Sequence, residues 1–80
     1  MKKIKVYSRP GCHLCELLLE ELIDFLRNSE FIEVINIDLD RALKKKFNTE
    51  IPVVEFDGEV LFQYEFDSNI MKNILDKLEQ

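Results

Sequence analysis

The sequence predicts an α/β domain in which a mixed four-stranded sheet is flanked by helices, with the element order βαβαββα. Apolar residues alternate with polar ones near the start of the chain, recur every four residues in three later stretches, and flank the Asp57-Gly58 pair. Alternation is typical of strands, the four-residue recurrence of helices, and Asp-Gly of a hairpin turn. A strand–helix–strand unit in the first half requires a parallel, right-handed crossover, whereas the hairpin in the second half is antiparallel.

The first half of the chain is predicted to hold a strand, a long helix and a second strand. Residues 3–7 alternate as a strand does, and Ser8–Gly11 form a loop because proline and glycine interrupt both regular structures. From about His13 to Asn28 the pattern is helical. Its apolar stripe consists of Leu14, Leu18, Leu22 and Leu26, with Leu19, Ile23 and Phe25 beside them. Residues 31–38 are rich in Phe, Ile and Val, which predicts a buried strand.

The second half is predicted to hold a short helix, a hairpin and a last helix. Leu39, Leu43 and Phe47 lie four apart across the short helix, which Asp38 or Asp40 could cap. Two strands follow on either side of the Asp-Gly turn, Ile51–Phe56 and Val60–Phe62. In the last helix Ile70, Ile74 and Leu78 recur every four residues, and Asp67 or Ser68 can cap it. Since the sequence contains no repeat and no linker, we expect residues 1–80 to form a single domain.

Charge and hydropathy exclude several classes of partner. The net charge is −5 and the longest lysine run is Lys44–Lys46, so nucleic acid is not an expected partner. Residues 1–3 are followed by further charges rather than by an apolar stretch, which argues against a signal peptide. The longest apolar run near the cysteines, Leu17–Leu19, is far too short to span a bilayer, so we expect no membrane partner. We expect a monomer in the cytoplasm, where thiols are kept reduced.

Two cysteines, Cys12 and Cys15, lie between the Pro10-Gly11 turn and the leucine-rich helix. A structural zinc site needs four Cys or His ligands, and the chain has 2 Cys and 1 His, so we expect no structural metal. Free cysteines are often buried as small hydrophobic residues, but Cys12 follows a loop at the start of the predicted helix, a place of exposure. Electron exchange explains this placement better than either alternative.

A cysteine at a helix N-terminus is chemically activated. The helix end carries roughly half a positive charge and unpaired N–H groups, which stabilise a thiolate. Cys12 would then attack a disulfide, and Cys15, about one turn further along, would resolve the mixed disulfide. His13, between them, either favours the Cys12 thiolate as a cation or faces solvent. In a strand–helix–strand context this spacing is typical of a thioredoxin-like redox motif, so we predict an enzyme, a dithiol–disulfide oxidoreductase.

The segments VYSRPGCHLC and IPVVEFDGEV, with the leucine-rich helix between them, resemble the glutaredoxins and small glutaredoxin-like proteins of the thioredoxin superfamily. The resemblance extends over the whole chain in element order and implies a thioredoxin-like fold. It also implies that Pro52 forms a cis peptide bond facing the dithiol and, with Ile51, shapes the surface where substrate docks. Arg9 matches a basic residue that can pair with a glutathione carboxylate, and Asp67 and Ser68 match polar residues near the other carboxylate.

Glutathione is thus a candidate co-substrate, but the sequence departs from the family where this tripeptide would bind. The Gly-Gly that precedes the last helix in the family is replaced by FQYEF, residues 62–66. Glycines let the backbone approach a ligand closely, whereas aromatic residues do not. Glu50 lies where the family usually has Thr, and its carboxylate should repel an anionic ligand. We therefore predict weak glutathione binding and no bound cofactor.

The expected partners are a protein or low-molecular-weight thiol that carries a disulfide, and a thiol reductant or reductase. Two other functions are compatible with the same sequence. The cysteine pair could bind or carry a soft metal ion, Cu(I) or Zn, although no Met or further Cys lies near it. Alternatively, the chain could be a redox-inactive interaction domain with a thioredoxin fold, and its cysteines would then fail to cycle with dithiothreitol.

Overall fold

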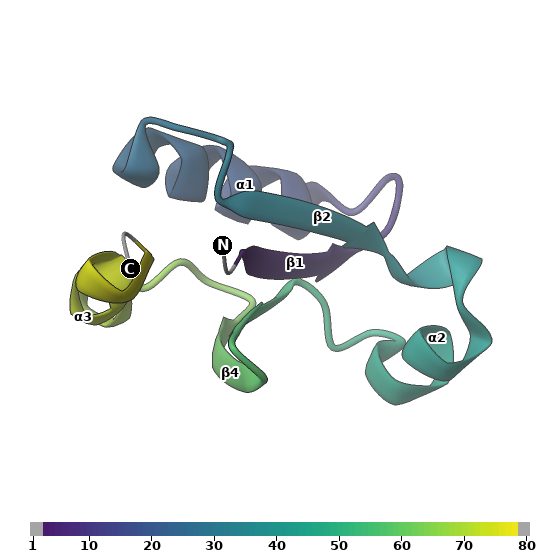
Figure 1. Cartoon of the computed structure of the whole chain (residues 1–80). Helices are drawn as coiled ribbons and strands as arrows, with labels where there is room; N and C mark the ends of the chain where they lie inside the picture. The colour runs from purple at the N-terminus through teal and green to yellow at the C-terminus, as the bar shows by residue number, and fades with distance from the viewer. Residues whose placement is uncertain (1–2, 79–80) are drawn as a thin grey trace.

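Figure 1 shows the computed structural model of the chain, which describes residues 3–78. The helices and strands follow the order that the sequence predicts, with one short 3₁₀ turn, η1, added between the second strand and the second helix. The bounds are β1 Ile4–Ser8, α1 His13–Leu26, β2 Ile32–Asn36, η1 Ile37–Leu39, α2 Arg41–Phe47, β3 Val53–Phe56, β4 Glu59–Gln63 and α3 Ser68–Leu78.

The four strands form one mixed sheet in the order β2-β1-β3-β4. β1 and β2 are parallel, with Ile4 opposite Ile32, whereas β3 is antiparallel to both β1 and β4. The mixed four-stranded sheet is therefore confirmed. The prediction that residues 31–38 form a buried strand is wrong: β2 is an edge strand, and its Val34 is 51% exposed. β-Branched residues favour a strand wherever it lies, so composition does not distinguish an edge strand from a central one.

The side chains of the sheet pack against helices on both faces, because neighbouring residues of a strand point to opposite sides. Val6 and Val54 contribute to a core cluster with α1 and α3, and Tyr7 and Val53 to a second cluster with α2. The first cluster contains Ile4, Val6, Leu18, Leu22, Val54, Phe56, Phe62, Met71, Ile74 and Leu78. The second contains Tyr7, Cys15, Ile37, Phe47, Ile51 and Val53. Figure 1 shows α2 set apart from α3, near the ends where β1 and β2 finish.

The buried stripe of α1 differs from the predicted one. Leu14 is 51% exposed and Ile23 is 37% exposed, whereas Cys15, Leu18 and Leu22 are buried. A helix repeats every 3.6 residues, so positions exactly four apart drift around its axis, and the 3-4 spacing of the buried residues follows one face more closely. The helix also ends at Leu26 rather than Asn28, because Arg27 takes a left-handed conformation with φ 57°.

Two aspartate side chains cap α2 and α3 and so mark where these helices begin. The Oδ1 atom of Asp40 accepts hydrogen bonds from the backbone N–H groups of Ala42 (2.8 Å) and Leu43 (3.2 Å). Asp67 does the same at the start of α3, for the N–H groups of Asn69 (3.0 Å) and Ile70 (3.1 Å). Of the alternatives left open by the sequence, Asp40 and Asp67 are therefore the caps.

Leu39 was expected within the short helix, but it lies in η1 and is 85% exposed. The turn forms because the Asn36 side chain accepts a hydrogen bond from the Asp38 N–H group (2.9 Å). That bond ends β2 before the predicted residue 38 and delays the helix until Arg41.

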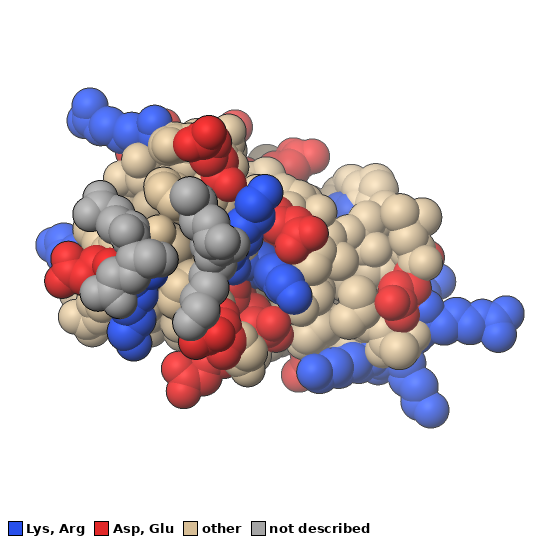
Figure 2. Space-filling view, viewed as in Figure 1, with Lys and Arg blue, Asp and Glu red and all other residues tan. Residues whose placement is uncertain are grey.

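Charged side chains of both signs are interspersed over the face seen in Figure 2. The clearest group of Lys and Arg side chains projects from the end formed by α2, where Lys44–Lys46 occupy the last helical turn. Within residues 3–78, no helix is both long and apolar enough to cross a membrane.

Candidate functional site

The loop after β1 places Cys12 at the start of α1. Gly11 has φ 82°, a conformation that favours glycine, and the Cys12 N–H group donates to the Arg9 carbonyl (3.3 Å). Cys12 itself is extended, with φ −83° and ψ 103°, and is the N-cap of α1. Its carbonyl accepts the first helical hydrogen bond, from the Glu16 N–H group (3.1 Å). The chain turn that the Pro-Gly pair predicts is thus what places the first cysteine at the helix end.

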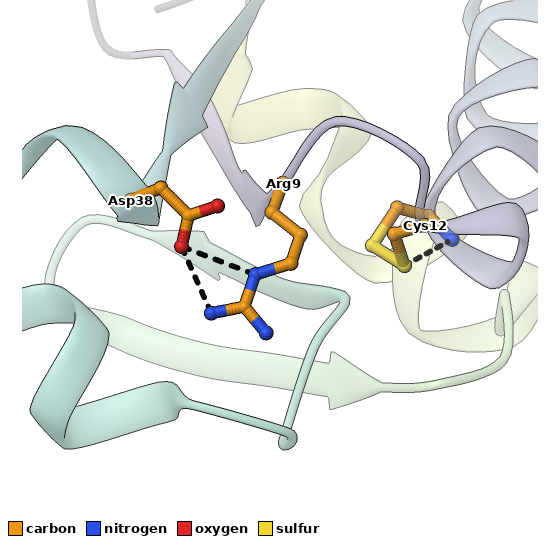
Figure 3. The surroundings of a disulfide bond; sticks show 4 residues. Arg9, Cys12 and Asp38 are labelled. Carbon is orange, nitrogen blue, oxygen red and sulfur yellow. Dashed lines mark hydrogen bonds and ion pairs between the residues drawn. A yellow bond between two sulfur atoms is a disulfide. The ribbon is translucent and has the colours of Figure 1, made fainter.

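Cys12 and Cys15 form a disulfide bond, and their Cα atoms lie 5.2 Å apart (Figure 3). The two cysteines differ in accessibility, because Cys12 is half-buried whereas Cys15 is 3% exposed. A molecule that approaches from solvent therefore reaches the Cys12 sulfur first. This asymmetry agrees with the order of reaction that the sequence predicts.

The helix end supplies a hydrogen-bond donor to the Cys12 sulfur. The backbone N–H group of Cys15 donates to Cys12 Sγ at 3.2 Å, drawn as a dashed line in Figure 3. In the reduced protein the same donor, and the positive end of the helix dipole, would face a thiolate at this position. The geometry is therefore suited to stabilising the anionic form of Cys12, the form that attacks a disulfide.

Arg9 is paired with Asp38 across the loop, as Figure 3 shows. Both Nε (3.1 Å) and one terminal nitrogen (2.9 Å) of the guanidinium donate to the same carboxylate oxygen, Asp38 Oδ1. Arg9 is the residue that the family resemblance assigns to a glutathione carboxylate. In this chain the Asp38 carboxylate already accepts hydrogen bonds from two nitrogens of the Arg9 guanidinium.

His13 is exposed in the first turn of α1, and no hydrogen bond or ion pair connects its side chain to another residue of the described chain. The position is compatible with both roles that the sequence leaves open, a cation near Cys12 or a solvent-facing side chain.

Ile51 and Pro52 precede β3, and the peptide bond between them is cis, as the resemblance implies. Ile51 is 7% exposed and belongs to the same core cluster as Cys15, against which Cys12 also packs. The structure therefore brings Ile51 together with both cysteines. Asp67 and Ser68 lie at the start of α3, where the Asp67 carboxylate caps the helix. The substrate-binding roles of these four residues stay predictions.

Tyr7 lies close to the site, in the same core cluster as Cys15. Its ring packs on Phe47 with centroids 4.7 Å apart, and its hydroxyl donates to Glu55 Oε1 at 3.3 Å. Burial and then the negative charge of Glu55 raise the pKa of Tyr7 above its ordinary value. Tyr7 therefore keeps its proton near neutral pH and supports the packing rather than acting as a base.

Sequence reasoning missed two features around the cysteines. The sequence indicates Asp38 only as a possible helix cap, and its pairing with Arg9, 29 positions away in the chain, has no local sequence signal. A groove beside α1, described below, was also missed, although the spacing of Leu14, Leu17 and Glu21 along one side of the helix hints at it. Within residues 3–78, no group of three or more His, Cys, Asp or Glu side chains gathers where it could hold a metal ion.

Comparisons with known proteins agree with this geometry. Residues 3–76 match the family described as the Glutaredoxin-like domain. The glutaredoxin-like protein YDR286C homolog of Dictyostelium discoideum is 32% identical over an alignment of 73 residues, and the match covers 82% of this chain and 68% of that protein.

Solved structures show the same fold. The solution structure of protein Ne2328 from Nitrosomonas europaea is 36% identical, with a TM-score of 0.78 over 92% of this chain and 91% of that one. A crystal structure of a mutant of the thioredoxin-like protein BC3987 is 27% identical, with a TM-score of 0.62 over 95% of this chain and 97% of that one.

Proposed function

Since the chain belongs to the glutaredoxin-like domain family, we propose that it is a thiol–disulfide oxidoreductase in which Cys12 attacks the substrate and Cys15 resolves the product. The observation that carries this proposal is the asymmetric pair at the start of α1. Cys12 is half-buried and its Sγ accepts a hydrogen bond from the helix end, whereas Cys15 is buried one turn further along the helix. A metal-binding role is less favoured, because the pair supplies only two of the four ligands of a structural zinc site, and no Met or further Cys lies near it in the sequence to help hold a soft ion such as Cu(I).

The proposed reaction moves two electrons in two exchanges. The Cys12 thiolate attacks one sulfur of the substrate disulfide, forms a mixed disulfide, and releases the other substrate sulfur as a thiolate that takes a proton from water. Cys15, after losing its proton, attacks the Cys12 sulfur and releases the second substrate thiol. The substrate disulfide is then reduced, and the pair is oxidised to the Cys12–Cys15 disulfide. A thiol reductant or a reductase restores the dithiol.

Burial of Cys15 suits its role as the second nucleophile. A thiol that solvent hardly reaches does not compete with Cys12 for incoming disulfides, yet the disulfide in the structure demonstrates that its sulfur reaches Cys12. The segment at Ile51 and Pro52, which lies in or beside the cluster that holds both cysteines, would support the substrate backbone as an added strand does. Such docking would hold the substrate disulfide in line for attack.

We propose protein or peptide disulfides, rather than glutathione mixed disulfides, as the preferred substrates. Three features weaken a glutathione site. Asp38 pairs with Arg9, the Asp67 carboxylate accepts from the N–H groups at the start of α3, and Glu50 adds a negative charge. An anionic tripeptide would have to displace or approach these carboxylates. The proposed setting is the cytoplasm, where a reductant is available and thiols are kept reduced.

The test is catalysed reduction of insulin by dithiothreitol, measured with the wild-type protein and with Cys12→Ser and Cys15→Ser. We expect the wild type to accelerate reduction and Cys12→Ser to lose the acceleration entirely, because no attacking thiolate remains. Cys15→Ser should retain only a small fraction of the rate, since each mixed disulfide must then wait for dithiothreitol. A wild-type protein that cycles with dithiothreitol but gives no acceleration, or a Cys12→Ser protein as active as the wild type, would contradict the proposal.

A further inference from the structure

A groove of about 320 Å³ lies beside the cysteine pair, between α1 and the segment that connects β4 to α3. Its wall on the α1 side includes Leu14, the residue between His13 and Cys15, so the groove begins within the Cys-x-x-Cys motif itself. The lining residues are Leu14, Leu17, Leu18, Glu21, Tyr64, Glu65 and Phe66.

Leucine and aromatic side chains form the apolar part of the groove, and several of them are open to solvent. Leu14 is 51% exposed and Leu17 is 42% exposed, although leucine is usually buried, and Tyr64 is 44% exposed. Apolar side chains gathered in one concave place mark a binding surface more often than apolar side chains scattered singly. The groove therefore offers contact area to an apolar group of a partner.

The far wall of the groove is held in place. The Tyr64 N–H group donates to the Pro52 carbonyl (2.9 Å), which ties this wall to the segment that precedes β3. Phe66 packs edge-on against Phe62, with ring centroids 5.8 Å apart, and against Phe25 of α1 at 5.6 Å. A partner would thus meet a preformed surface, which lowers the entropic cost of binding.

Two carboxylates in the groove have no positively charged partner among the residues that the structure describes. Glu21 comes from α1 and Glu65 from the β4–α3 segment, and both are exposed. Within the described part of the chain, neither side chain takes part in a hydrogen bond or an ion pair, unlike Asp38 with Arg9. The whole chain also carries a net charge of −5. This surface therefore favours a cation and disfavours an anion such as glutathione.

We infer that the groove docks the substrate, a protein segment that places an apolar side chain and a neighbouring Lys or Arg a few residues from the disulfide that Cys12 attacks. A Lys or Arg side chain fits this surface well, because its apolar stem can lie on Leu14 and Leu17 while its charged end reaches the carboxylates. An extended chain advances about 3.3 Å per residue, so a few residues bridge the distance from the reacting sulfur to the groove. The inference rests on the proposed function and names its substrate class.

The test uses three disulfide-containing peptides that differ only at two positions close to the cysteine: Leu-Lys, Leu-Glu and Ser-Gln. We measure kcat/KM for reduction of each by the wild-type protein. We expect Leu-Lys to be preferred over Leu-Glu by about fivefold or more, because the Glu peptide replaces two attractions with two repulsions. The preference should shrink as salt is added, since exposed charges are screened.

Substitutions of the lining residues identify those responsible for the preference. Glu21→Gln with Glu65→Gln should lower the ratio of kcat/KM for Leu-Lys to that for Leu-Glu at least twofold, and Leu17→Ser should lower the ratio for Leu-Lys to that for Ser-Gln. Glu20→Gln removes the same charge from an exposed position of α1 outside the groove, and it should leave both ratios unchanged.

The outcomes separate the inference from the proposed function. Reduction of all three peptides at equal rates, or a Leu-Lys preference that the Glu21→Gln and Glu65→Gln changes do not alter, overturns the groove assignment and leaves the oxidoreductase proposal intact. Failure of the wild-type protein to reduce any of the three peptides overturns the proposed function, and the inference with it.

Discussion

At the scale of single residues, the pairing of Arg9 with Asp38 is the clearest departure from what the family resemblance implies. Both nitrogens contact one oxygen, at 3.1 and 2.9 Å, and the two side chains are 26% and 37% exposed. An ion pair this exposed contributes little to the free energy of folding. We expect the pair to affect ligand choice nonetheless, because a carboxylate ligand would have to compete with Asp38 for the same guanidinium.

Asp38→Asn tests this effect on glutathione. The neutral amide should release Arg9 and raise kcat/KM for a glutathione mixed disulfide by about two- to fivefold, the range typical of one exposed charge pair. Adding Arg9→Gln should cancel the gain, which separates release of Arg9 from a general loss of negative charge. Asp76→Asn, an exposed change at the far end of α3, serves as the charge-matched control. Equal rates for Asp38→Asn and the control would show that Asp38 does not oppose glutathione.

At the scale of helices and strands, the spacing of apolar residues predicts which elements form, but it predicts neither where they end nor which of their faces is buried. The sequence identifies α1, α2 and α3 because apolar residues recur at helical spacing, and the hairpin because Asp57-Gly58 permits positive φ at both turn positions. It includes Leu14 in the apolar stripe of α1, but the structure leaves this residue exposed. The sequence also does not reveal η1. A hydrogen bond from the Asp38 N–H group to the Asn36 side chain creates that turn, and no hydrophobic pattern marks it.

For the helices, we predict how much the Asp67 cap at the start of α3 contributes to stability. Asp67→Ala removes the acceptor for the N–H groups of Asn69 and Ile70 and should lower the free energy of unfolding by about 1 kcal/mol. Asp67→Asn keeps an acceptor oxygen at the same place and should retain most of that stability. Urea unfolding followed by far-ultraviolet circular dichroism gives both values. If the two variants unfold at the same urea concentration, Asp67 does not stabilise α3 through its cap.

At the scale of the whole molecule, local signals predicted more than distant ones. The Cys-x-x-Cys motif, the turn before it and the helix after it are contiguous, so the sequence alone places Cys12 at the helix end, and the structure confirms it. Contacts between segments that lie far apart in the sequence cannot be predicted from such local patterns. Leu17 and Tyr64 line one groove although they are 47 positions apart in the chain, and only the packing of α1 against the β4–α3 segment creates this groove. The fold is therefore more predictable from the sequence than the groove that we propose as the substrate-docking surface.

The central claim is that Cys12 attacks and Cys15 resolves, and a trapping experiment tests it most directly. Reduced wild-type, Cys15→Ser and Cys12→Ser proteins are each mixed with a disulfide-containing peptide, quenched with acid and measured by intact mass and peptide mapping. Cys15→Ser should accumulate one peptide, attached to Cys12, because the resolving thiol is missing.

The wild type should carry no peptide and should lose two hydrogens, as the internal disulfide forms and the peptide is released fully reduced. Cys12→Ser should remain almost unlabelled, because Cys15 is 3% exposed. A peptide attached to Cys15 of Cys12→Ser as fast as to Cys12 of Cys15→Ser, or a wild-type protein that stays a dithiol beside excess peptide disulfide, would contradict the account.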